Sequence, residues 1–175
     1  MPKDFTSHNL MVLKKSVKQG TINALGRDAA IELFRNLAHS VLDWVENKSY
    51  TYENHTWNLT DSIGCAIYDH GVVIETFFPP QKSSSHGPRT ITYHGQKQVI
   101  YGRLLLREAV NDMEIASLGP FSFGVFAAAP YGLWVDKSWG YGGESKRGKG
   151  WFTDELTSFV ENEFRRLKNE FINSK

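Results

Sequence analysis

The glycine- and lysine-rich residues 143–149, GESKRGK, are the stretch whose residue types and spacing most closely match a known binding motif. They fit the first seven positions of the phosphate-binding pattern G-x-x-x-x-G-K, in which backbone amides and a lysine cradle phosphates. The eighth position is Gly150, where a Ser or Thr hydroxyl would coordinate magnesium, and the preceding SWGYG is no buried strand. The segment leaves two interpretations open, a nucleotide- or phosphate-binding loop and a basic loop that contacts a neighbouring protein.

Other chemistry-bearing side chains show no recognisable catalytic or metal-binding spacing. The six histidines form no HxH or HExxH pattern, and no G-x-S-x-G elbow or paired-acid motif occurs. The single cysteine, Cys65, excludes an internal disulfide and lies in an apolar alternation, which predicts a buried, unreactive thiol. The sequence therefore predicts no cofactor, no metal and no enzymatic activity.

Composition favours one globular domain without a strong electrostatic field. The chain has 175 residues, 41% of them apolar and 22% charged, with a formal net charge of +1. This length and apolar content can form a sizeable core, and the neutral balance argues against general binding to nucleic acid or anionic membranes. No signal-peptide pattern or long apolar run is present, which predicts a soluble protein of a reducing compartment.

A β-hairpin over residues 61–78, DSIGCAIYDHGVVIETFF, is the element around which the rest is organised. Alternation places Ile63, Cys65 and Ile67 on one face of its first strand, and Val72 opens the second. Between the strands, Gly71 supplies the positive φ of a tight turn. A lone hairpin is marginal in water, so other elements must cover it.

Those other elements follow from periodicity and breakers. Residues 1–26 are predicted as an extended or partly mobile arm and residues 27–175 as one α+β domain. The small antiparallel sheet is built on the central hairpin, with an N-terminal and a C-terminal helix packed on one face and a long loop and helix inserted. The expected segments are a helix over 28–47, a loop insertion over 81–98, a helix over 101–116, a strand over 121–129, a strand or short helix from 133, a loop over 139–150 and a helix over 153–171.

Two short motifs resemble a family of phage proteins. Residues 55–64, HTWNLTDSIG, resemble the T-G-x-L-x-x-S-I element of neck and tail-completion proteins of tailed bacteriophages, with Trp57 in place of the glycine. Residues 129–136, APYGLWVD, resemble the later element in which a strand ends in a tyrosine followed by Val-Glu. The order of elements agrees over roughly residues 28–170, although the frequent Pro-Phe-Leu ending of the family is absent.

The resemblance implies a non-enzymatic virion protein, assembled in the host bacterial cytoplasm, that forms a homo-oligomeric ring between the portal or connector and the tail. Its implied partners are portal, connector and tail proteins, with transient non-specific contact to DNA and no membrane. Two alternatives remain, an enzyme that uses the loop 143–150 and a monomeric adaptor for protein interactions. The polar insertion and the basic, aromatic loop supply the predicted contacts with subunits or partners: His86, Arg89, Tyr93, Trp139, Tyr141, Lys146, Arg147 and Lys149.

Overall fold

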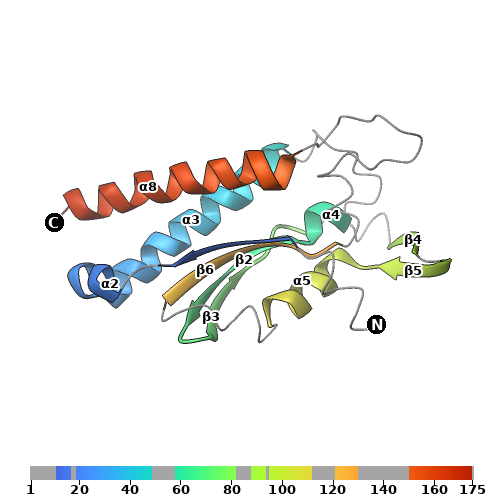
Figure 1. Ribbon diagram of the computed structural model, residues 1–175, viewed down its shortest axis with the longest axis horizontal. Helices are drawn as coiled ribbons and strands as arrows, with labels where there is room; N and C mark the ends of the chain where they lie inside the picture. The colour runs from blue at the N-terminus through green and yellow to red at the C-terminus, as the bar shows by residue number, and fades with distance from the viewer. Residues whose placement is uncertain are drawn as a thin grey trace.

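Helices cover both faces of an antiparallel sheet in the computed structural model (Figure 1), which confirms the predicted α+β class. The structure describes residues 11–16, 19–48, 58–81, 88–93, 95–111, 121–129 and 150–174. The elements in chain order are β1 Met11–Ser16, α2 Gln19–Leu25, α3 Arg27–Lys48, α4 Asn58–Asp61, β2 Ile63–Asp69, β3 Val72–Phe77, β4 Arg89–Tyr93, β5 Gln96–Ile100, α5 Gly102–Val110, β6 Phe121–Ala127, the π-helical turn η2 Trp151–Leu156 and α8 Thr157–Asn173.

The predicted hairpin is confirmed as β2 and β3, which lie in a four-stranded sheet of order β1-β6-β2-β3. Asp69 pairs with Val72, so His70 and Gly71 form the turn, with φ of 49° and 81°. Two successive positive φ values are typical of the tight turns that match the twist of a hairpin. On its other side β2 pairs with β6, opposing Cys65 to Val125. β2 is therefore a central strand and β3 an edge strand.

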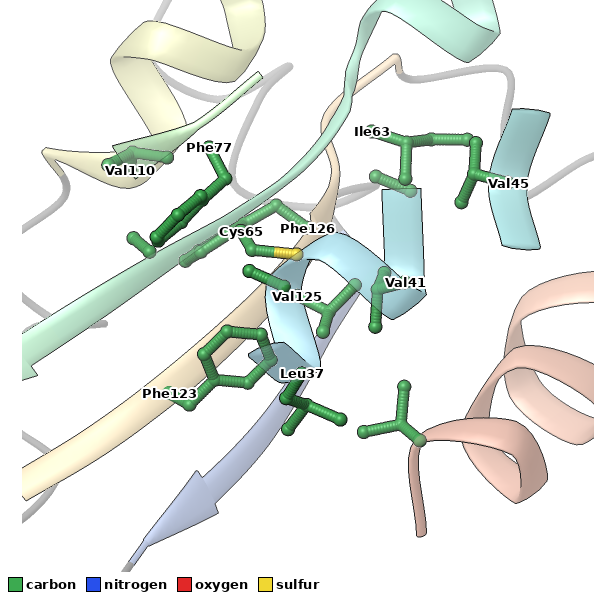
Figure 2. Packing of buried hydrophobic residues seen from close by; sticks show 14 of the residues in the cluster. Leu37, Val41, Val45, Ile63, Cys65, Phe77, Val110, Phe123, Val125 and Phe126 are labelled. Atoms are coloured by element: carbon green, nitrogen blue, oxygen red, sulfur yellow. The ribbon is translucent and has the colours of Figure 1, made fainter. Parts of the chain in front are cut away.

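The first face of the sheet packs against α3 and α8. Phe34 of α3 is fully buried and stacks on Phe121 and Phe123 of β6, each with a centroid distance of 5.3 Å, and on Phe164 of α8 at 6.1 Å. Further along α3, Leu37 and Val41 project toward Cys65 and Val125 (Figure 2). The N-terminal and C-terminal helices thus pack together over one face of the sheet, as the sequence predicts.

The second face is covered by α5, whereas the sequence predicts helices on one face only. Gly64 allows α5 to pack this closely, because a Cβ at this position would lie 2.7 Å from Leu106 Cδ2 of α5. Tyr68 of β2 donates a hydrogen bond of 2.7 Å to the carbonyl oxygen of Val110, at the end of α5. As a result, β2 is buried on both faces except at Asp69, its last residue.

Cys65 lies between these layers, and its thiol is fully buried. Burial strongly raises the pKa of the thiol, because the thiolate would lose its hydration. We expect iodoacetamide to leave native Cys65 unmodified and to alkylate it fully once the chain is unfolded in guanidinium chloride, with intact mass as the measurement. Rapid alkylation of the native protein at neutral pH would contradict the predicted inert thiol.

Two segments expected as irregular are regular in the structure. The predicted arm 1–26 contributes β1, which pairs with β6 from Met11 opposite Ala127 to Ser16 opposite Ser122, and α2. The predicted loop 81–98 contains β4 and joins β5 through a turn at Gly95, where φ is 77°. Both predictions were based on the polar composition of the segments. A strand that pairs with a neighbour can nevertheless carry polar side chains on an exposed face.

The two remaining helix predictions are confirmed in part. Residues 102–110 of the helix predicted over 101–116 form α5, and residues 112–116 lie outside the described residues. Residues 130–149 lie outside them too, and with them the expected segment from 133 and most of the loop 139–150. The C-terminal helix begins two residues before the predicted start, in the π-helical turn η2, and continues as α8. Gly150 precedes that turn in a left-handed conformation.

Candidate subunit interface

An open strand edge is the first feature of the described structure that can bind another chain. β3 and β1 are the two edge strands of the sheet, and among the described strands only β2 pairs with β3. Its exposed residues are Val72, at 64% exposure, Ile74, at 37%, and Thr76. An edge strand presents unpaired backbone N–H and C=O groups, which form a template for a further strand.

The charged residues of the β2–β3 hairpin are turned toward α3. Glu75 Oε2 accepts a hydrogen bond of 2.7 Å from Arg35 Nε, and Asp69 Oδ2 accepts one of 2.8 Å from Arg27 Nη2. Hydrogen bonds from Arg27 and then from His70 hold the pKa of the Asp69 carboxyl below its usual range. The exposed positions of β3 consequently carry no charge of the kind that blocks edge-to-edge pairing in many proteins.

A separate ribbon of two strands, β4 and β5, is the second feature. Its register runs from Arg89 opposite Ile100 to Tyr93 opposite Gln96. Figure 1 shows the ribbon extending beyond α5, at the end of the molecule away from α2 and from the β2–β3 turn. Lys97 and Val99 of β5 are exposed, and only Ile100 at its end is buried.

Next to the ribbon, two large apolar side chains are exposed at the start of α5. Leu104 is 54% exposed, whereas Leu105, Leu106 and Val110 are buried. Three successive leucines in a helix point in different directions and cannot all face one sheet. The run 104–106 therefore indicates that one of the three is exposed. Tyr101, just before α5, is exposed as well.

Two arginines of α5 contact the residues that follow β3. The Arg103 guanidinium lies 5.1 Å from the ring centroid of Phe78 and donates a hydrogen bond to the Pro79 carbonyl oxygen, and Arg107 lies 6.0 Å from the same ring. Burial lowers the pKa of Arg103, and the nearby Asp61 carboxylate opposes that change. These contacts position the open edge relative to α5.

The part of the phage-like motif that the structure describes forms a buried corner at the start of β2. Ser62 Oγ donates a hydrogen bond of 2.7 Å to the Leu59 carbonyl oxygen, and Asn58 Oδ1 accepts one of 2.8 Å from the Gly102 amide. Asn58, Leu59, Thr60, Asp61 and Ser62 are all buried. The corner joins the sheet to α5 and exposes no group for binding, so its role in the described structure is to position these elements.

Most of the predicted contact residues lie outside the described part of the chain. Arg89 and Tyr93 are the two ends of β4, and the structure brings them into the ribbon through their backbone pairing. The open edge with Val72 and Ile74 was missed, because an apolar run at the start of a strand indicates burial. The others lie in ranges on which the structure gives no information: His86, Trp139, Tyr141, Lys146, Arg147 and Lys149.

The described residues contain neither a metal-binding cluster nor a membrane span. Among them no group of three or more His, Cys, Asp or Glu side chains could hold a metal ion. No helix within these same ranges is both long and apolar enough to cross a membrane. The loop 143–149, for which the sequence left phosphate binding and protein contact open, falls outside them, and Gly150 is its first described neighbour.

Comparison with known proteins adds no relative. No family model, no curated protein and no solved structure matches this chain.

Proposed function

We propose that this protein is a non-enzymatic structural subunit of the neck or tail-completion region of a tailed bacteriophage. In this proposal, identical copies form a ring between the portal or connector and the tail. The observation that carries it is the open, uncharged edge of β3 in a chain that also extends a separate β-ribbon. Two different binding surfaces on one subunit generate heterologous contacts, which close into rings when the rotation between neighbours allows it.

The resemblance supports the choice of a phage neck. Its leucine, serine and isoleucine correspond to Leu59, Ser62 and Ile63, all of which are buried in the corner that starts β2. Basic residues on the lumen side of such a ring would contact passing DNA transiently through its phosphates, without reading its sequence.

Native mass spectrometry and negative-stain imaging test the proposal. We expect the purified protein, alone or mixed with portal and connector proteins, to give closed rings of one defined mass, because each copy offers two complementary surfaces. The protein mixed with an unrelated oligomeric ring is the control for non-specific association. Monomers as the sole species, both alone and with portal and connector proteins, would exclude a ring subunit.

A further inference from the structure

We propose that the open edge of β3 in one subunit pairs with the β4–β5 ribbon of the next copy, which makes one sheet continuous across each seam of the ring. This inference rests on the proposed ring, and it names the two segments that form the contact. The seam is defined by the exposed β3 residues Val72 and Ile74 on one side and by β5 residues Gln96–Ile100 on the other.

Of the two segments in the proposed seam, the β4–β5 ribbon would gain more stability from a further strand. A two-stranded sheet is at best marginally stable in water, and independent stability requires a third strand or a covering layer. β4 and β5 pair only with each other among the described strands, and three of the five β5 side chains, including those of Lys97 and Val99, are strongly exposed on one or other face. Pairing with β3 would supply the third strand.

The dimensions and charges of the two segments are compatible. β3 has six residues and β5 has five, so β5 can pair along nearly all of β3. β5 carries one charged residue, Lys97, and β3 carries one, Glu75, which pairs with Arg35, so the seam brings no like charges together.

A second copy satisfies these requirements better than an unrelated strand does. The ribbon extends away from the β2–β3 turn of its own chain (Figure 1), so the two segments are placed to meet between molecules. In a closed ring every copy has both its β3 edge and its ribbon paired, whereas a foreign strand on β3 would leave the ribbon open.

Lysine at the edge is the first test. Lysines on edge strands oppose further pairing, so Ile74→Lys should weaken self-association at least about tenfold, as measured by sedimentation equilibrium. The matched control is Ile172→Lys, at a 49% exposed isoleucine of α8, which should associate like the wild type. Equal association of Ile74→Lys and the wild type would overturn the seam, as would equal weakening by both variants.

Cross-linking is the second test, and it remains informative if a variant changes stability. Cys65 is buried, so Val72→Cys and Lys97→Cys place the reactive thiols on the two sides of the seam. With a short flexible bis-maleimide, the double variant should give a ladder of covalent oligomers, and a mixture of the single variants should give dimers. Each single variant alone should stay uncross-linked, because the contact is heterologous.

The outcomes separate this inference from the proposed function. Rings without a ladder from the double variant would overturn the β3–ribbon seam and leave the ring standing. Covalent dimers from one single variant alone would show an isologous contact, which overturns the seam as well. Monomers without a ladder, both alone and with portal and connector proteins, would overturn both proposals.

Discussion

Replacing Phe34 by alanine is expected to lower the free energy of unfolding by about 3–5 kcal/mol, the range found for large-to-small changes in a packed core. The ring is fully buried and stacks on two rings of β6 and one of α8, so its loss leaves a cavity where three elements meet. Because small domains are stable by about 5–15 kcal/mol, the variant would lose a large part of its stability.

Unfolding in guanidinium chloride, followed by circular dichroism, measures this effect. Phe34→Leu should cost less, because leucine fills part of the cavity. Asp43→Ala, at an exposed position of the same helix, should change stability by less than about 0.5 kcal/mol. A loss below about 1 kcal/mol for Phe34→Ala would show that this ring does not join α3, β6 and α8.

Gly102→Ala is expected to cost about 1–3 kcal/mol, although alanine is ordinarily the better helix former. A Cβ at this position would lie 2.0 Å from the Asn58 carbonyl oxygen and 2.8 Å from the carbonyl carbon. Both atoms belong to the backbone of α4 and cannot move aside as a flexible side chain would. The start of α5 must therefore shift, which strains the buried hydrogen bond from the Gly102 amide to Asn58 Oδ1.

Gly20→Ala provides the matched control for this prediction. Gly20 lies within α2 and is exposed, and a Cβ added there would meet no atom within 4 Å, so alanine should be neutral or stabilising by up to about 1 kcal/mol. Thermal unfolding of the two variants beside the wild type gives the comparison. If Gly102→Ala melts with or above the wild type, the close approach of α5 to the corner before β2 is wrong.

Stability and the proposed assembly should respond to different substitutions. Phe34 and Gly102 act within the subunit, at the core and at the corner that places α5. Ile74 lies on the open edge and is 37% exposed, so its replacement should alter the mass of the proposed assembly and cost less stability than Phe34→Ala. A variant that loses both properties together would indicate that folding depends on assembly.

Sequence reasoning predicted well those elements whose pattern is local. The stripe of α3, the strand alternation of β2 and the stripe of α8 repeat at the periods that helices and strands impose, and Gly71 marks the turn between β2 and β3. Burial of Cys65 followed from its place in that alternation. Each of these predictions needed only neighbours within one element.

Other features depended on partners distant in sequence. The sequence predicts β1 as part of a polar arm. Its pairing with β6, more than 100 residues later, makes it a strand of the sheet. The ribbon was predicted as a loop because its sequence is mostly polar, and Gln96 and Lys97 are indeed exposed in β5. The candidate interface could not be predicted for the same reason, since the apolar run at Val72 gives no sign that β3 is an edge strand.

The sequence by itself determined the α+β class, the hairpin and the two long amphipathic helices, because periodicity and turn chemistry act over a few residues. Only the tertiary structure decided the strand order, the covering of the second face by α5 and the position of β3 at the open edge. These follow from backbone pairing and from the close approach that Gly64 and Gly102 permit, and neither leaves a periodic trace in the sequence.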